Sequence, residues 1–230
     1  MKQYAIHVNL TGCSTLVVGA GAVGLRKIQG LIAACPQKII ILDPALKHNN
    51  VRDPLEKIFA EFPHIKPIFL ARSPQESDFH GVRLAFAATD NSEINRQVYT
   101  FCQRHNVLCN MADAQYNDFT VPAHSSTEGI DITLSTGGAS PALARQLRLD
   151  IEELIKKRYT GLSGVLKRLR PLILSLQLTT AENTVIFRSI VVSSLGELLS
   201  QGNVPAARQL LQELLPEALH THIEKVLYDF

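Results

Sequence analysis

The sequence predicts an α/β fold, in which a parallel sheet with helices on both faces is followed by a small β segment and a helical region. Three observations support this prediction. Apolar runs alternate with helical stretches through the first half of the chain, the stretch at 16–27 reads "LVVGAGAVGLRK", and the pattern changes after residue 113. We therefore expect three parts, at 1–113, 114–138 and 139–230.

The first part supplies the strands and helices of the expected sheet. Short apolar runs between turn residues are typical of strands buried on both faces. They occur at 14–19, 38–43, 66–71, 82–90 and 107–113, and residues 4–10 alternate loosely, as in a short strand or a sheet edge. Helices are expected at 22–34, at 54–62 and at 92–106, with Pro36 ending the first helix and Ser92 capping the third.

The remaining chain has a different pattern. Two strand-like runs within 118–138 flank the polar turn "HSSTEG" and predict a hairpin, in which Pro122 indicates an edge or an irregularity. From Ser140 onward the chain is helical in character. Breaks between these helices are expected at 160–164, 179–183 and 202–205.

Composition excludes several classes of protein. The 230 residues are 46% hydrophobic and 19% charged, which is ordinary for a globular chain with a substantial core. A net charge of +2 provides no field that would attract nucleic acid or a membrane surface. The first ten residues lack the apolar core of a signal peptide, and no apolar run approaches the length of a membrane span. We therefore expect a cytoplasmic protein.

The four cysteines do not form a metal or disulfide pattern. None belongs to a C-x-x-C pair, and each lies beside apolar sequence. We expect small buried thiols in a reducing compartment, at Cys13, Cys35, Cys102 and Cys109.

The glycine turn at 19–24 fits the pattern G-x-G-x-x-G. Gly19 permits a tight turn, Gly21 lets a pyrophosphate approach the backbone, and Gly24 lets the helix pack against the strand. The amides of Ala22 and Val23 would face phosphates at the helix N-terminus, where the helix dipole favours anions. Because the turn follows a strand and opens a helix, dinucleotide binding is favoured over a mere tight turn.

Asp43 ends the next predicted strand, 19 residues after Gly24. A carboxylate there accepts hydrogen bonds from the adenosine ribose hydroxyls and repels a 2′-phosphate, which favours NAD over NADP. We place Asp43 and the neighbouring Pro44 in the cofactor site. The alternative is that Asp43 only caps the turn before Pro44.

Two further strand ends carry polar residues. In "AFAATDN" (85–91), Thr89 and Asp90 would lie near the nicotinamide side of the crevice, although the same loop also suits a cap for the following helix. In "CNMADA" (109–114), Asp113 ends a strand at the same edge of the sheet. An acid in that position suits proton transfer, and a structural capping role is the alternative.

The stretch "LSTGGASPALARQLR" (134–148) predicts a second anion-binding helix start. Ser140 is the expected N-cap, with Pro141 at the first helical position. Hydroxyls, open amides and one cation would bind a carboxylate-rich ligand, through Ser135, Thr136, Gly137, Gly138, Ser140 and Arg145. The later basic residues are expected to form a solvated helix face, at Lys156, Lys157, Arg158, Lys167, Arg168 and Arg170.

Taken together, the sequence resembles the precorrin-2 dehydrogenase family, the dehydrogenase/chelatase module of sirohaem synthesis. The resemblance rests on "VVGAGAVGLRK", "AFAATDNSEINRQV", "CNMADA" and "STGGASPALARQLR", in this order, between residue 14 and about residue 150. It implies an NAD-binding Rossmann domain, a β dimerisation segment and a helical domain, assembled as an intertwined homodimer.

The resemblance also implies a reaction. Precorrin-2 gives a hydride to NAD+ and loses a proton, yielding sirohydrochlorin and NADH. The family's essential acid, in the motif CN-x-x-D, matches Asp113, and Asn110 of the same motif becomes an expected substrate contact. The chain departs from the family in having Thr136 where a regulatory serine often stands, and a short segment between Asp113 and Phe119. A C-terminal methyltransferase domain is also lacking, so we expect another protein to methylate uroporphyrinogen.

Two alternatives remain open at this point. In the first, the enzyme also inserts ferrous iron, which the macrocycle nitrogens bind, so no metal cluster is required; the histidines at 105, 124, 220 and 222 form no convincing ligand set. In the second, the chain is a non-catalytic sensor of NAD(H) that reports to a partner.

Overall fold

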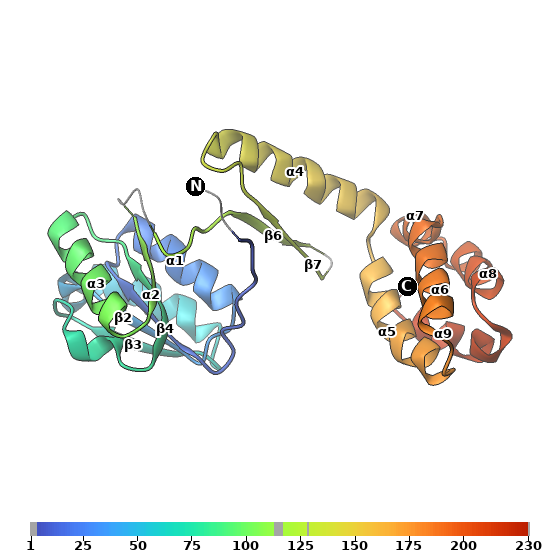
Figure 1. The fold of residues 1–230 in the computed structure, drawn as a ribbon, viewed down its shortest axis with the longest axis horizontal. Helices are drawn as coiled ribbons and strands as arrows, with labels where there is room; N and C mark the ends of the chain where they lie inside the picture. Colours follow the sequence, from blue (N-terminus) through green and yellow to red (C-terminus); the bar gives the residue numbers. More distant parts are fainter. Residues whose placement is uncertain (1–3, 113–116, 128, 230) are drawn as a thin grey trace. The chain divides into compact units, whose positions relative to one another are not determined.

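The structure is a computed structural model that describes residues 4–112, 117–127 and 129–229. The chain forms two compact units (Figure 1). The first is Gln3–Val121, and the second is Pro122–Phe230 together with Met1–Lys2. The predicted boundaries at 113 and 138 stay predictions, and Asp113 lies outside the described residues.

A five-stranded parallel sheet forms the centre of the first unit, as the sequence predicts. The strand order is β3-β2-β1-β4-β5. The strands are β1 (Ser14–Val18), β2 (Lys38–Leu42), β3 (Lys66–Leu70), β4 (Val82–Ala87) and β5 (Leu108–Met111). Residues 4–10 form no strand, because no neighbouring strand pairs with them among the described residues.

Helices cover both faces of this sheet, which confirms the predicted fold class (Figure 1). They are α1 (Ala22–Ala33), α2 (Asn49–Ala60) and α3 (Ser92–Arg104), with the 3-10 turns η1 (Pro44–Lys47) and η2 (Glu76–Phe79). Helix α2 begins five residues earlier than expected and contains Pro54 within its first turns. Asn91, and not Ser92, caps α3, because its side chain accepts the amides of Glu93 and Ile94.

Two apolar cores form on opposite faces of the sheet. Ile28 and Leu31 of α1 pack with Val17 and Ile39 on one face. On the other face, Val98 of α3 packs in a cluster with Leu16 of β1 and Ala85 of β4. Burying such side chains contributes roughly 1.5–3 kcal/mol each, so the two cores stabilise the sheet from both faces.

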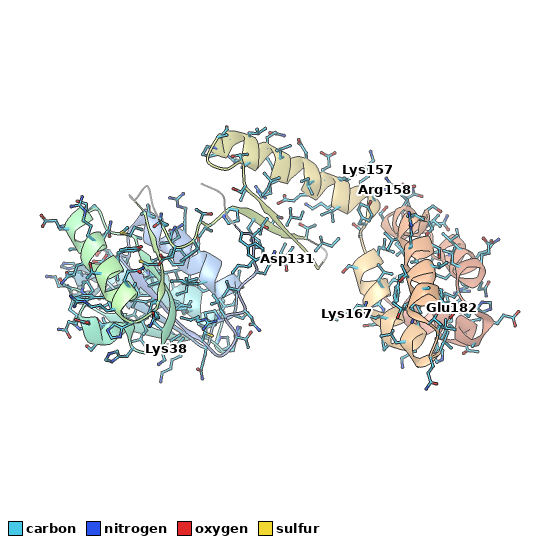
Figure 2. All side chains as sticks on the ribbon, in the orientation of Figure 1. Lys38, Asp131, Lys157, Arg158, Lys167 and Glu182 are labelled. Carbon is cyan, nitrogen blue, oxygen red and sulfur yellow. The ribbon has the colours of Figure 1, made fainter. Side chains whose placement is uncertain are left out.

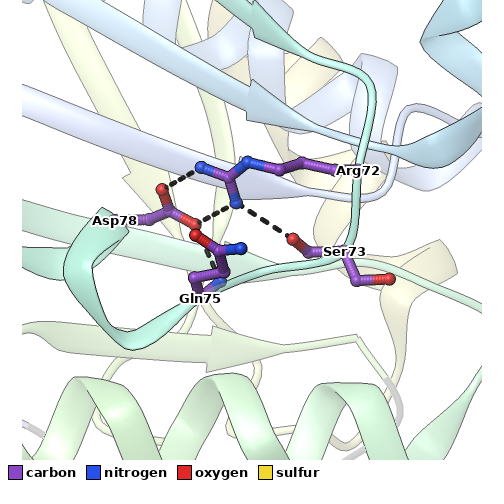
Figure 3. A network of polar contacts seen from close by, with 4 residues as sticks. All are labelled: Arg72, Ser73, Gln75 and Asp78. Atoms are coloured by element: carbon purple, nitrogen blue, oxygen red, sulfur yellow. Dashed lines mark hydrogen bonds and ion pairs between the residues drawn. The ribbon is translucent and has the colours of Figure 1, made fainter.

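An ion pair stabilises the connection between β3 and β4 (Figure 3). Arg72 donates from both terminal nitrogens to the carboxylate of Asp78, at 2.8 and 2.6 Å, and Gln75 adds its backbone amide at 2.8 Å. Burial acts to raise the pKa of the Asp78 carboxyl, but the hydrogen bonds from Arg72 and Gln75 and the Arg72 charge together outweigh it. The pKa of Asp78 is therefore lowered from its ordinary value.

This lowered pKa predicts an acid-dependent contribution to stability. Because the folded pKa lies below the unfolded value of about 3.9, the contribution is complete above that value and disappears as the pH falls through the folded pKa. Arg72 is 37% exposed, so we expect Asp78→Asn to lower the free energy of unfolding at neutral pH by only about 1 kcal/mol. Urea unfolding from pH 7 down to about 2.5 should show this difference shrinking below about pH 4; a difference that stays constant would contradict the assignment.

The second unit begins with an antiparallel hairpin packed against a long helix. Strands β6 (Ala123–Thr127) and β7 (Ile130–Leu134) pair, and helix α4 (Pro141–Arg158) contacts both. The hairpin is confirmed, but the polar stretch "HSST" belongs to β6 and not to the turn. Its residues alternate between half-buried and exposed, so polar side chains at His124 and Ser126 point to solvent while their neighbours face α4.

Short helices around one apolar core form the rest of the second unit. They are α5 (Leu162–Ser175), α6 (Thr180–Val192), α7 (Leu195–Ser200), α8 (Val204–Leu214), η3 (Glu217–His222) and α9 (Ile223–Val226). Helices α5, α6 and α8 begin where the sequence indicates breaks, whereas the break at 193–194, before α7, was not expected. There Gly196 lies so close to the Arg158 carbonyl that a Cβ atom would overlap it. The tight packing of α7 against the end of α4 explains that break.

The basic residues that follow residue 155 are mostly exposed, as the prediction of a solvated face requires (Figure 2). Arg168 is the exception. Its guanidinium donates to the Val226 carbonyl at 2.8 Å, pairs with Asp229 at 2.6 Å and lies over the Tyr228 ring. Arg168 therefore fastens the last described residues to α5.

The expectation of four buried cysteines is wrong for two of them. Cys102 and Cys109 are buried between α3 and β5, but Cys13 is half-buried and Cys35 is exposed. Cys35 lies just after α1 with a φ of 50°, in a turn that reaches solvent. All four thiols are free. Within the described ranges, no helix is both long and apolar enough to cross a bilayer.

Candidate functional site

The strand order places a topological switch point between β1 and β4. Here the chain reverses its direction of progress through the sheet, since β2 and β3 lie on one side of β1 and β4 and β5 on the other. Ligands of open α/β sheets bind at the carboxyl ends of strands that meet at such a switch point. The loops after β1, β2 and β4 therefore form the candidate site.

Gly19 packs the first of these loops directly against β4. Its amide donates to the Leu42 carbonyl at 2.8 Å, and its φ of +102° is one that residues with a side chain rarely adopt. A Cβ atom at Gly19 would lie 2.5 Å from the Ala88 carbonyl oxygen. The tight turn expected at this position is therefore present.

Gly21 and Gly24 have different surroundings. A Cβ atom at Gly24 would overlap the Gly19 carbonyl oxygen, so this glycine is needed for the turn itself. A Cβ atom at Gly21 would meet nothing within 4 Å, and Gly21 is exposed. The fold does not explain Gly21, whereas the close approach of a phosphate to the backbone does.

The first turn of α1 offers amides to an anion. Gly21 is the N-cap and gives no side-chain hydrogen bond to the helix, and the first helical bond runs from Leu25 to the Gly21 carbonyl. Ala22 is exposed and Val23 is half-buried. Their amides and the positive end of the helix dipole are the elements that bind pyrophosphate in glycine turns.

Asp43 connects the glycine turn to the end of β2. Its carboxylate accepts the Ala20 amide at 2.7 Å and the Ala45 amide at 2.8 Å, so the capping role before Pro44 is real. A carboxylate has about four acceptor positions, and two remain for ribose hydroxyls. Capping and cofactor binding are therefore compatible at Asp43, while the exposed Pro44 borders the same edge.

The loop after β4 is organised by Asn95, a residue for which the sequence predicts no role. Asn95 is 1% exposed, accepts the Thr89 amide at 3.2 Å and donates to the Thr89 carbonyl at 3.0 Å. The Thr89 hydroxyl lies 2.8 Å from the same side chain. The exposed Asp90 and its neighbours Asn91–Glu93 line an open hollow at the start of α3.

The segment at 117–119 returns along β5. Asn117 accepts the Met111 amide at 2.6 Å, and Asp118 accepts the Cys109 amide at 2.9 Å. Asn110, predicted to contact substrate, is 7% exposed and donates to the Phe119 carbonyl at 2.9 Å. Asn110 thus attaches the 117–119 segment to β5 through this hydrogen bond. Substrate contact by Asn110 stays a prediction.

The loop before α4 is a compact turn in the second unit. Gly137 and Gly138 have φ values of 62° and 88°, and the Thr136 hydroxyl accepts the Ser140 amide at 3.2 Å. Ser140 caps α4 by accepting the Leu143 amide, as predicted, and the Ser135 hydroxyl accepts the Gly137 amide. The Ser135 and Ser140 hydroxyls each keep a proton to donate to a ligand.

The two arginines of α4 differ in availability. Arg148 pairs with Glu152 one turn further along the helix, whereas Arg145 is exposed and has no ion pair in the described part of the chain. Arg145 is therefore the cation of this helix start that is free to bind an anion. Nowhere in 4–112, 117–127 or 129–229 do three or more histidine, cysteine or acidic side chains gather around a point suitable for a metal ion.

The fold and the glycine turn define a dinucleotide-binding protein of the Rossmann class. A family model described as putative NAD(P)-binding matches residues 6–123, which contain this site. The chain therefore belongs to the putative NAD(P)-binding family, and NAD(P) is its cofactor class.

Relatives and a solved structure extend this comparison. The siroheme synthase of Nitrosococcus oceani is 29% identical over 218 residues, which are 94% of this chain and 44% of the relative. That of Methylococcus capsulatus is 34% identical over 172 residues, covering 74% and 34%. The chain spans less than half the length of these relatives. The solved structure of SirC, a precorrin-2 dehydrogenase, has a TM-score of 0.69 at 23% identity and covers 92% of this chain and 98% of its own, which shows a shared fold.

Proposed function

We propose that this protein oxidises precorrin-2 to sirohydrochlorin with NAD+ as the hydride acceptor, in the synthesis of sirohaem or a related modified tetrapyrrole. The observation that supports this most is the combination of an uncapped glycine turn at the sheet's switch point with the motifs that resemble the precorrin-2 dehydrogenase family. The siroheme synthase relatives and the fold shared with SirC support the same assignment.

NAD is the proposed dinucleotide. Pyrophosphate would bind at Gly21 and at the amides of Ala22 and Val23, where α1 has no cap of its own. The Asp43 carboxylate would accept the adenosine ribose hydroxyls with its remaining lone pairs. A 2′-phosphate would place further negative charge beside this carboxylate, so NADP is disfavoured.

The proposed reaction requires a proton acceptor as well as a hydride acceptor. Precorrin-2 loses a hydride to the nicotinamide and a proton to a base, so that the products are sirohydrochlorin, NADH and H+. We assign the base to Asp113, the acid of "CNMADA", which comes two residues after the last residue of β5 in the sequence. As a carboxylate it also stabilises cationic character that develops on the macrocycle during oxidation.

Substrate carboxylates need donors and cations. The acetate and propionate arms of a tetrapyrrole would bind to the Ser135–Ser140 turn and to Arg145. The amides of Gly137, Ala139 and Ser140 bond within this turn, so the donors proposed here are the Ser135 and Ser140 hydroxyls and Arg145. The 18-residue helix α4 directs its positive end toward the turn.

A homodimer is the proposed assembly, and exposed leucines of α4 support it. Leu143, Leu147 and Leu154 are 50%, 38% and 50% exposed, and their spacing of four and seven residues puts them on one helix face. Helix α4 already contacts β6 and β7, and its buried residues, Ala144 and Ile155, do not belong to the leucine stripe. A second copy would bury this leucine stripe, which monomeric proteins rarely leave in water.

We expect Leu147→Asp combined with Leu154→Asp to convert a dimer into a monomer. Each leucine contributes roughly 1.5–3 kcal/mol when buried, so the pair would weaken association by at least about a hundredfold. Light scattering coupled to gel filtration measures the mass directly. Leu174→Asp, at a 49% exposed leucine of α5, is the matched control and should not change the mass; a dimer that persists in the α4 variant would contradict the assignment.

The function is tested by anaerobic incubation with enzymatically made precorrin-2 and NAD+, followed by addition of ferrous iron. Formation of NADH together with sirohydrochlorin supports the proposal, and a metal-dependent second phase faster than without protein adds iron insertion. NAD binding without any oxidation would favour the sensor alternative instead.

A cytoplasmic location is also proposed, supported by four free thiols.

A further inference from the structure

The Arg72–Asp78 ion pair lies at the same sheet edge as Asp43. Strands β2 and β3 are parallel neighbours, Leu42 pairs with Leu70, and the Asp43 amide donates to the Leu70 carbonyl at 3.2 Å. The segments that follow β2 and β3 therefore leave the sheet side by side, about 5 Å apart. Arg72 follows Leu70 by two residues, so it starts the loop beside the proposed ribose site.

Asp78 occupies the guanidinium of Arg72 in a bidentate pair (Figure 3). The Nη1 atom of Arg72 also donates to the Ser73 carbonyl oxygen at 3.0 Å. The Asp78 side chain is 8% exposed and that of Arg72 is 37% exposed. The Asp78 carboxylate therefore neutralises the partly exposed Arg72 guanidinium and fixes its position.

The other basic side chains at this edge differ in their pairing. Arg52 of α2 pairs with Glu56 at 2.6 Å and lies over the Phe69 ring of β3. Lys47 ends η1 and is exposed. An arginine recognises a phosphate more specifically than a lysine does, because its planar fork donates two parallel hydrogen bonds. Arg72 is thus the group whose release would change phosphate recognition most.

We propose that Asp78 is a specificity-determining residue, which engages Arg72 and so withholds from a 2′-phosphate the cation that NADP binding requires. NADP-binding Rossmann sites place an arginine near the adenosine ribose for this purpose. Here Asp43 faces the ribose and Asp78 occupies the arginine, so the edge accepts hydroxyls and rejects the phosphate. This inference rests on the proposed function insofar as NAD is the acceptor.

Calorimetric titration of NAD+, NADP+, 5′-AMP and 2′,5′-ADP tests the inference without any tetrapyrrole. Asp78→Asn should lower the ratio of the NADP+ to the NAD+ dissociation constant by about tenfold, as a freed charge-assisted hydrogen bond would. The ratio for 2′,5′-ADP against 5′-AMP should fall likewise. Asp78→Ser, whose hydroxyl still accepts the Gln75 amide, provides a second variant if the first is unstable.

The gain must depend on Arg72. Adding Arg72→Met to Asp78→Asn should return the ratio to its original value, whereas adding Lys47→Met should preserve the gain. An ion pair that only fastens the loop would weaken both dinucleotides equally, and an unchanged ratio in both Asp78 variants would overturn the inference. If the unaltered protein prefers NAD+ but does not oxidise precorrin-2, the proposed function fails while this inference stands.

Discussion

Gly21→Ala should leave the fold intact and weaken NAD+ binding by a factor of roughly 5–150. A Cβ atom at this position meets nothing within 4 Å in the protein, so the free energy of unfolding should change little. In the complex the same atom would fill the space of the pyrophosphate, and a steric cost of about 1–3 kcal/mol corresponds to that loss of affinity. Calorimetric titration and urea unfolding of the same preparation measure both quantities.

Two further glycines of the same segment provide the controls. Gly30→Ala, also with open space around it, should bind NAD+ normally and gain about 0.5–1 kcal/mol, because alanine favours a helix. Gly24→Ala should lose both stability and binding, since its Cβ atom would overlap the Gly19 carbonyl. Normal NAD+ affinity in Gly21→Ala would remove the phosphate role from the glycine turn.

Asp113→Asn should lower the rate of precorrin-2 oxidation by roughly 10²–10⁴, which is the usual contribution of a positioned general base. The amide cannot accept the proton, but it retains the size of the side chain. The NAD+ dissociation constant should stay unchanged, because the dinucleotide site is formed by the loops after β1, β2 and β4. Single-turnover kinetics with bound NAD+ separates the chemical step from binding.

A matched acid tests whether this effect is specific. Asp131→Asn changes an exposed carboxylate on β7 and should oxidise precorrin-2 at the original rate. If Asp113→Asn retains more than about a tenth of that rate, a different group accepts the proton and the assignment of Asp113 is wrong.

Features set by local sequence were predicted well. The strands at 14–18 and 38–42, the glycine turn and the Ser140 cap depend on neighbouring residues, so their patterns are visible in the chain itself. The α3 cap was misplaced by one residue because Asn91 and Ser92 are both good caps, and only the chain direction after β4 decides between them.

Features set by tertiary contacts were not predicted. Asn95 reaches the Thr89 loop from α3, and Asp118 accepts the Cys109 amide from a segment nine residues away. Asn95 lies within the motif "AFAATDNSEINRQV" and Asp118 lies in none, but the residue types alone do not reveal such contacts. Buried polar side chains are nearly always hydrogen-bonded, so the burial of Asn95 would have pointed to its role. That burial is visible in the structure but not in the sequence.

The proposed function requires that this chain transfers a hydride from precorrin-2 to NAD+. The most direct measurement is a single anaerobic turnover with protein in excess, in which NADH and sirohydrochlorin are quantified together. We expect one NADH for each sirohydrochlorin formed, with no reaction when NAD+ is left out. Precorrin-2 that persists beside bound NAD+, or sirohydrochlorin that forms at the same rate without it, would exclude the proposed dehydrogenase activity.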